Sequence, residues 1–207
     1  MNVPPRVPSI EVVSEKPTML KKGRLFIISG PSGVGKSTIL NAILERRPQL
    51  RYSISYTTRP RRGNERDGAD YHFINERDFR KKTDAGEFAE WAEVHGHLYG
   101  TSASYIEQML GGGQDVLLDI DVEGAKALSV RYPQALLVFI APPSMEELER
   151  RIKRRGMDAP AVVGVRLKNA ESEMNQAHLY DHVVVNDDLT RAVSKLEEII
   201  ENACSRK

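Results

Sequence analysis

The chain alternates continuous apolar runs with amphipathic segments of helical length. Residues 25–28 (LFII), 115–120 (DVLLDI) and 135–140 (ALLVFI) form such runs, a pattern typical of strands that are covered on both faces. A further run at 182–185 precedes a helix predicted from 189 to about 203. Because strands of this kind alternate with helices, the pattern predicts a doubly wound α/β fold with a parallel sheet.

Shorter elements fill the middle of the chain. Ser144 followed by Glu147 predicts a capped helix start, with Gly156 as its end. In that helix Arg151 and Arg155 share a face, and the simplest interpretation from the pattern alone is a solvated surface. The remaining expectations are a strand at 51–56, a polar loop at 57–70, a strand at 71–74, a helix at 76–86, a strand at 98–99 and a helix at 103–113.

A glycine-rich turn lies between the first strand and the helix that begins near residue 38. Its sequence is FIISGPSGVGKS, in which Gly30, Gly35, Lys36 and Ser37 fit G-x-x-x-x-G-K-[ST]. Glycines let successive N–H groups point inward at phosphate oxygens, Lys36 reaches the β and γ phosphates, and the Ser37 hydroxyl ligates magnesium. The turn therefore predicts a bound nucleoside triphosphate but names no acceptor. The residues predicted to bind this triphosphate are Gly30, Pro31, Ser32, Gly33, Val34, Gly35, Lys36, Ser37 and Thr38.

Composition narrows the function classes. The 207 residues are 40% hydrophobic and 29% charged with a net charge of +1, so no global attraction to nucleic acid or an anionic membrane is expected. A single cysteine, Cys204, excludes an internal disulfide and fits a reducing, cytoplasmic setting. No apolar stretch approaches the roughly 20 residues that span a bilayer. Residues 1–22 contain four prolines and no signal-peptide core, which predicts a flexible extension.

A pair of aspartates follows the apolar run at 115–120. Asp119 ends it and Asp121 comes directly after. Carboxylate oxygens suit magnesium, which keeps several of its waters, so Asp119 is a candidate for indirect, water-mediated contact with the ion. Two turn-forming aspartates explain the same spacing equally well.

Several ordered blocks resemble the guanylate kinase family, a group of nucleoside monophosphate kinases. The resemblance runs from Gly23 to the C-terminus. The blocks are GPSGVGKS (30–37), TTRPRRG (57–63), DGADYHF (67–73), EFAEWAEVHGHLYGT (87–101), LDIDVEG (118–124), FIAPPS (139–144), RRG (154–156) and VVVNDDL (183–189). Together they are far more specific than the glycine-rich turn alone.

The resemblance implies both a fold and a reaction. The fold is a P-loop NTPase core with a parallel sheet flanked by helices (about 23–54, 114–154 and 169–207), an inserted GMP-binding subdomain (about 55–113) and a helical lid (about 155–168). The reaction transfers the γ-phosphoryl group of ATP to GMP, and to dGMP, with Mg²⁺, in purine nucleotide metabolism. The expected partners are these small molecules, and the expected oligomeric state is a monomer or homodimer.

The resemblance also assigns residues to the two substrates. Arginines and tyrosines grip the GMP phosphate, and guanidinium forks suit that task; these are Arg59, Arg62, Tyr71 and Tyr99. Carboxylates accept the guanine N–H groups and hydroxyls contact O6; these are Glu90, Asp121, Ser55 and Thr101. The arginines that close over the transferring phosphoryl group are Arg151, Arg155 and Arg166. Asn186 matches a position near the adenine of ATP. Lys36 and Arg59 belong to the catalytic set as well.

The sequence departs from the family pattern at two places. Pro60 follows Arg59 directly, which leaves Arg61 and Arg62 as competing candidates for the second phosphate contact, of which we prefer Arg62. Residues 157–161 (MDAPA) replace the usual threonine and acidic residues of the lid. Two other functions are compatible with parts of the sequence: a kinase with another acceptor, and a protein-binding module that has lost nucleotide chemistry. Because the P-loop, Arg59, Glu90 and Asp121 are all present, an enzyme is favoured over the module.

Overall fold

A five-stranded parallel sheet with the order β2-β7-β1-β8-β9 forms the centre of the molecule. The computed structural model describes residues 22–94, 96–154 and 160–205. The strands of this sheet are β1 (Leu25–Ser29), β2 (Arg51–Tyr52), β7 (Val116–Asp119), β8 (Leu136–Ala141) and β9 (His182–Val185). The apolar runs of the sequence are thus confirmed as strands, and β1 lies in the middle of the sheet.

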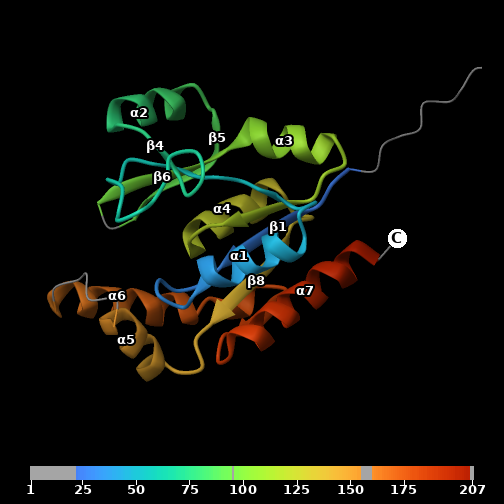
Figure 1. Ribbon diagram of the computed structural model, residues 1–207. Coiled ribbons are helices and arrows are strands. Elements are labelled where there is room, and N and C mark those ends of the chain that lie inside the picture. Colours follow the sequence, from blue (N-terminus) through green and yellow to red (C-terminus); the bar gives the residue numbers. More distant parts are fainter. Residues whose placement is uncertain (1–21, 95, 155–159, 206–207) are drawn as a thin grey trace, which may run out of the picture.

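Helices cover both faces of this sheet (Figure 1). One face packs against α1 (Lys36–Arg46), α5 (Met145–Arg154), α6 (Pro160–Met174) and α7 (Leu189–Ser205). The other face packs against α3 (Ala103–Gly111) and α4 (Val122–Arg131). Alternate residues of β1 follow this division, since Phe26 and Ile28 belong to the first core and Leu25 and Ile27 to the second. The predicted doubly wound α/β fold is confirmed.

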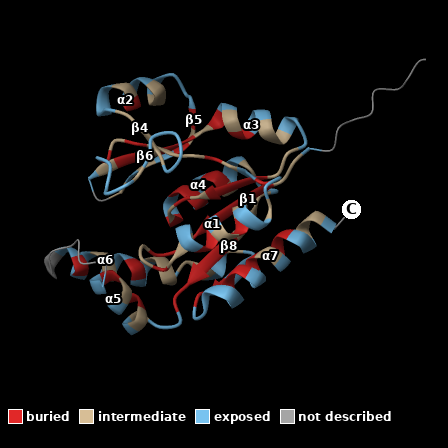
Figure 2. Ribbon diagram, viewed as in Figure 1, coloured by how far each residue is buried: buried red, intermediate tan, exposed pale blue. Residues whose placement is uncertain are grey.

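A second sheet, with the order β4-β3-β6-β5, is built entirely from residues between β2 and β7. Its strands are β3 (Tyr56–Thr57), β4 (His72–Phe73), β5 (Phe88–Val94) and β6 (His97–Ser102), and helix α2 (Glu76–Asp84) lies between β4 and β5 in the sequence. It has a small core of its own around Phe79, Phe88 and Leu98. Figure 2 shows that the buried residues concentrate in the first sheet and on the inner sides of its helices, whereas α2 is largely exposed or intermediate.

One strand prediction is wrong, and another covers only part of its strand. Residues 51–56 are not one strand, because Tyr52 pairs with Leu117 of the first sheet whereas Tyr56 pairs with Gly100 of the second. The chain therefore crosses between the sheets at residues 53–55. The predicted strand at 98–99 is confirmed as part of the longer strand β6, whereas its partner β5 was not predicted. Only pairing across the hairpin identifies β5 as a strand, since its own sequence has no alternating pattern.

Other predictions concern helix ends and segments near them. The Ser144 hydroxyl accepts a hydrogen bond from Glu147 N at 3.2 Å, which confirms the N-cap. The Glu147 side chain pairs with Arg150 and Arg151. Residues 1–21 and Gly156 lie outside the described residues. Within the described ranges, no helix has the length and apolar character needed to cross a bilayer. A short 3-10 turn, η1 (Ala177–Leu179), follows α6.

Candidate active site

A cavity of about 850 Å³ lies where the carboxyl ends of β1 and β7 face the second sheet. It is bounded by the glycine-rich turn, the 59–71 loop region, β5, β6 and helix α6. The structure brings most of the predicted site residues into its wall. They are Gly30, Pro31, Ser32, Gly33, Gly35, Lys36, Ser37, Ser55, Arg59, Arg62, Tyr71, Glu90, Tyr99, Asp119, Asp121 and Arg166. The predicted residues outside this wall are Val34, Thr38, Thr101, Arg151 and Asn186, and Arg155 lies outside the described residues.

The glycine-rich turn adopts a conformation that only glycine can hold without strain. Gly30 has φ 142°, and a Cβ there would lie 2.2 Å from the Ile140 carbonyl oxygen. Gly35 has φ 101° and directly precedes α1. The Lys36 ammonium donates a hydrogen bond to the Gly30 carbonyl at 2.6 Å and lies 4.0 Å from Asp119 Oδ1. The turn thus places a cation and the N-terminal end of α1 at one end of the cavity.

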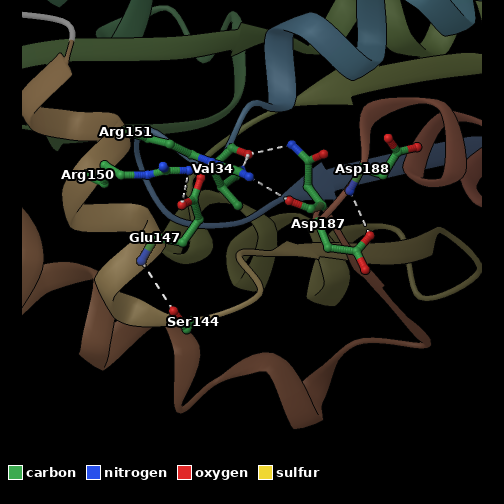
Figure 3. A network of polar contacts seen from close by, with 8 residues as sticks. Val34, Ser144, Glu147, Arg150, Arg151, Asp187 and Asp188 are labelled. Carbon is green, nitrogen blue, oxygen red and sulfur yellow. Dashed lines mark hydrogen bonds and ion pairs between the residues drawn. The ribbon is translucent and has the colours of Figure 1, made fainter.

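The back of the turn is anchored by side chains from distant parts of the chain (Figure 3). The Asn186 side-chain amide donates to the Val34 carbonyl at 2.7 Å, and Arg151 Nη1 donates to the same oxygen at 3.2 Å. Arg151 also donates from Nη2 to the Asn186 carbonyl at 3.0 Å and from Nε to Glu147 at 2.7 Å. Arg151 is therefore held against the glycine-rich turn, and only 21% of its side chain is exposed.

Aspartates 119 and 121 lie between the two ends of the cavity. Asp119 ends β7, and burial raises its pKa while the nearby Lys36 ammonium opposes the rise. Asp121 Oδ1 accepts a hydrogen bond from Gly124 N at 2.7 Å and so caps α4. Asp121 thus has two places in the structure: it is the N-cap of α4, and it also lines the cavity.

Glu90 is a carboxylate held in a nearly dry position. Its side chain comes from β5 next to a β-bulge, the residue is 9% exposed, and the Thr101 hydroxyl on β6 donates to its Oε1 at 2.5 Å. Burial raises the pKa of Glu90 to about 7, partly opposed by the Thr101 hydrogen bond and increased by the negative charge of Asp121. Thr101 is not part of the cavity wall, but it holds Glu90, which is.

Basic and aromatic side chains gather at the far end of the cavity. The Arg59 guanidinium is only 6% exposed, lies 5.3 Å from the centre of the Tyr71 ring, and pairs with Glu65 at 2.7 Å. The Tyr71 and Tyr99 rings meet edge to face at 5.9 Å. Arg62 lines the cavity.

Arg61, the competing candidate, turns elsewhere. Its guanidinium lies 5.2 Å from the centre of the Phe73 ring and 3.8 Å from Asp67, and it is not part of the cavity wall.

Helix α6 closes one side of the cavity. Arg166 Nη2 donates to the Ser32 hydroxyl at 2.5 Å, which links this helix directly to the glycine-rich turn. Glu173, which the sequence did not single out, also lines the cavity, and burial raises its pKa to about 7 against the effect of Lys36. It lies seven residues after Arg166 on one helix, and that spacing of two turns is a signal that could have found it. Glu65 and Tyr52 are further cavity residues that the sequence did not indicate.

The parallel sheet, the glycine-rich turn and the adjoining pocket of arginines and carboxylates define a P-loop NTPase fold of the kinase type. The guanylate kinase family model matches residues 22–203. The chain is 50% identical over 179 residues to a guanylate kinase of Symbiobacterium thermophilum, covering 86% of this chain and 85% of the relative. It is 46% identical over 179 residues to one of Thermotoga maritima, covering 86% of each.

A solved structure agrees with these sequence relatives. The crystal structure of guanylate kinase from Anaplasma phagocytophilum superimposes with a TM-score of 0.75 at 33% identity, covering 90% of this chain and 88% of that one. The chain belongs to the guanylate kinase family. It is therefore placed among the nucleoside monophosphate kinases, as the resemblance in the sequence implied.

Proposed function

We propose that this protein transfers the γ-phosphoryl group of ATP to GMP, and also to dGMP, giving ADP and the guanosine diphosphate. One observation carries the proposal: a single cavity has the glycine-rich turn at one end and the pocket of Arg59, Arg62 and Glu90 at the other. Two nucleotides whose phosphates meet in the middle suit such a cavity. Membership of the guanylate kinase family supports the same reaction.

ATP is assigned to the end formed by residues 30–38. The backbone N–H groups of the turn and the Lys36 ammonium hold its β and γ phosphates in this proposal. Arg151 and Asn186 support the turn through the Val34 carbonyl. In this proposal Asn186 also lies near the adenine of ATP.

GMP is assigned to the opposite end. Arg59, Arg62, Tyr71 and Tyr99 hold its phosphate, and the place of Arg62 in the cavity wall supports it over Arg61. The guanine N1 and N2 donors face the carboxylates of Glu90 and Asp121, and Ser55 and Thr101 complete the base pocket, Thr101 by holding Glu90. Adenine would place the N1 lone pair against a carboxylate, so this pocket selects guanine.

Transfer needs no general base, because the attacking oxygen belongs to the GMP phosphate and is already anionic at neutral pH. Catalysis then consists of holding two polyanions in line and compensating the charge between them. Lys36, Arg59 and Arg166 line the cavity and are assigned to this task in the proposal, together with Arg151 and Arg155. Movement of α6 toward the second sheet would exclude water, which otherwise hydrolyses ATP.

Magnesium fits the oxygens at the ATP end. Ser37 and Asp119 both line the cavity beside Lys36, and within the described part of the chain no group of three or more His, Cys, Asp or Glu side chains could hold a metal ion. A hydroxyl and a carboxylate, Asp119 acting through water, are the few hard ligands expected for an ion that arrives with the triphosphate and keeps its waters. Bound Mg²⁺ supplies compensation of phosphate charge.

The remaining assignments follow from the proposed reaction. In this proposal the chain is divided into a core, an inserted GMP-binding subdomain at about 55–113 and a lid at about 155–168. The setting we infer is cytoplasmic, with small nucleotides as partners, no nucleic acid or membrane, and a monomer or homodimer as the assembly.

A coupled assay of ADP release with GMP, dGMP, AMP, CMP and UMP tests the proposal. We expect GMP and dGMP to be used, with kcat/KM for AMP lower by about 10²-fold or more, because a site that hydrogen-bonds a substrate discriminates strongly against an unmatched one. Comparable rates with AMP would identify a kinase of another acceptor. Tight peptide binding without any turnover would point to the protein-binding module.

A further inference from the structure

Glu65 holds together the two arginines assigned to the acceptor phosphate. Its Oε1 accepts a hydrogen bond from Arg59 Nη2 at 2.7 Å, and its Oε2 accepts one from the backbone N–H of Arg62 at 2.8 Å. The Glu65 N–H in turn donates to the Arg62 carbonyl at 3.1 Å, so the turn is closed twice. Gly63 lies inside this turn with φ 51°, in the left-handed region. One carboxylate therefore fixes both a side chain and a stretch of backbone.

Glu65 compensates the charge of the Arg59 guanidinium. The residue is 6% exposed, and a buried guanidinium without a charged partner is costly. Its Nη1 donates to the Pro60 carbonyl at 2.7 Å, but Glu65 is the carboxylate that forms its ion pair. The neighbouring basic residue, Arg61, is turned toward Asp67 and does not compete for Glu65.

Glu65 is ionised in this arrangement. Burial by itself would raise the pKa of Glu65, but the hydrogen bonds from the Arg59 side chain and the Arg62 N–H outweigh it and hold that pKa below its usual range. The Glu65 side chain is 24% exposed and lines the same cavity as Arg59 and Arg62.

We propose that Glu65 is a positioning residue for the acceptor phosphate: it orients the Arg59 guanidinium and fixes the Arg62 backbone so that both arginines face one phosphate. The inference rests on the proposed function and goes beyond it, because it assigns the preorganisation of the phosphate grip to a residue that need not touch the phosphate. Preorganised donors bind an anion more tightly than donors that must first be ordered. The alternative is that the Glu65 carboxylate occupies the position of the acceptor phosphate and must be displaced before that phosphate binds.

The test compares Glu65→Ala and the nearly isosteric Glu65→Gln with the unsubstituted chain. We expect the KM for GMP to rise about tenfold in Glu65→Ala, as for loss of a hydrogen bond to a charged group, while kcat and the KM for ATP change less than about threefold. Glu65→Gln retains one acceptor oxygen and is expected to lie between the two. Guanosine, which lacks the phosphate, should bind all three proteins equally in calorimetry.

Glu87→Ala is the matched control. It removes a carboxylate from the same part of the chain that also forms an ion pair of 2.7 Å, with Lys82, but Glu87 lies outside the cavity wall. We expect this variant to leave the KM for GMP unchanged.

The outcomes separate the inference from the proposed function. An unchanged or lowered KM for GMP in an active Glu65→Ala overturns the positioning role, and a lowered KM identifies the competing carboxylate. An equal loss of guanosine binding overturns it too, because the effect then lies outside the phosphate grip. Absence of GMP turnover and GMP binding in the unsubstituted chain overturns the proposed function and the inference together.

Discussion

The two ends of the cavity are built in different ways. The end proposed for ATP is one contiguous turn, residues 30–37, that continues a central strand and opens a helix, and its polar groups are largely backbone. The opposite end consists of side chains from the second sheet and its loops, and its charges are paired within the protein, as Arg59 with Glu65. The first end packs against the main core through Val34, whereas the sheet at the second end has only a small core of its own.

In the proposed function, this difference separates the tasks of the two ends. A backbone cradle binds phosphates whatever base is attached to them, whereas a side-chain pocket can distinguish one base from another. Substitutions at the ATP end should therefore act on transfer itself, and substitutions at the other end on the choice and affinity of the acceptor. The following changes test that separation.

Lys36→Ala should have the largest effect. We expect kcat to fall by about 10³-fold or more, because the ammonium is the main cation beside the transferring phosphates. The measurement is steady-state kinetics with GMP as acceptor. Lys126→Ala, at an exposed position of α4, is the control and should behave as the unsubstituted chain. Substantial activity in Lys36→Ala would remove the distinction between the two ends.

Glu90→Gln should raise the KM for GMP by about 10²-fold, as for a charged acceptor that faces the guanine donors. The KM for ATP should not change, which calorimetry with each nucleotide can check. Glu93→Gln makes the same change at an exposed position of the same strand and serves as the control. If GMP and ATP binding weakened together, the two ends would not be independent.

The pH profile should report the same carboxylate. The pKa of Glu90 is raised to about 7 by burial, with a further increase from the charge of Asp121. Below that pH the folded chain holds a proton that must leave before Glu90 accepts the guanine N–H groups. We therefore expect the KM for GMP to rise as pH falls below about 7, by up to tenfold per pH unit. In Glu90→Gln the KM for GMP should still depend on the titration of the GMP phosphate, but the part of the pH dependence that comes from Glu90 should be absent.

The stability of the folded chain should also depend on the titration of Glu90, but it should fall with rising pH, whereas GMP binding should improve. Because the pKa of Glu90 lies above its unfolded value of 4.5, the folded chain binds the extra proton between the two values and loses stability as pH rises through about 7. Chemical denaturation of the unsubstituted chain and of Glu90→Gln at pH 5 and 8 measures the difference. A pH-independent difference would contradict the assignment of that pKa.

Gly124→Ala should show a smaller effect that separates binding from stability. A Cβ at Gly124 would lie 2.9 Å from Glu90 Oε2, while Oε1 is held by Thr101. We expect the KM for GMP to rise about fivefold although alanine favours the helix by about 0.5–1 kcal/mol. Gly164→Ala, where a Cβ meets nothing within 4 Å, is the control. A less stable variant with normal GMP binding would contradict this prediction.

Asn186→Ala should have the smallest effect and act on the other end. Loss of its hydrogen bond to the Val34 carbonyl should lower the free energy of unfolding by about 1 kcal/mol and raise the KM for ATP about threefold. The KM for GMP should stay constant. A change confined to GMP would place the support of the glycine-rich turn in doubt.

The sequence predicts the two ends unequally for a physical reason. The glycine-rich turn could be interpreted from adjacent residues, and the strands β7 and β8 from their apolar runs. The segment FAEWAEV of β5 has apolar residues at 88, 89, 91 and 92, a spacing that suits a helix better than a strand. It is a strand because it pairs with β6, and that pairing is what places Glu90 beside Thr101.

Contacts across the chain were the least predictable feature. Asn186 and Arg151 meet Val34 over 152 and 117 residues of sequence, and no local pattern encodes those distances. The pairing of Arg59 with Glu65 spans only six residues, but it depends on the path of a polar loop that periodicity does not describe. Family resemblance supplied the positions of the residues proposed to bind the acceptor, and the structure supplied the contacts that these residues make.

The most direct test of the central claim, that one cavity holds both nucleotides, is inhibition by a compound in which adenosine and guanosine are joined by an oligophosphate chain. We predict that it binds once per chain, competes with both ATP and GMP, and loses affinity in Glu90→Gln as GMP does. Competition with only one of the two nucleotides, or binding of two molecules per chain, would contradict the account.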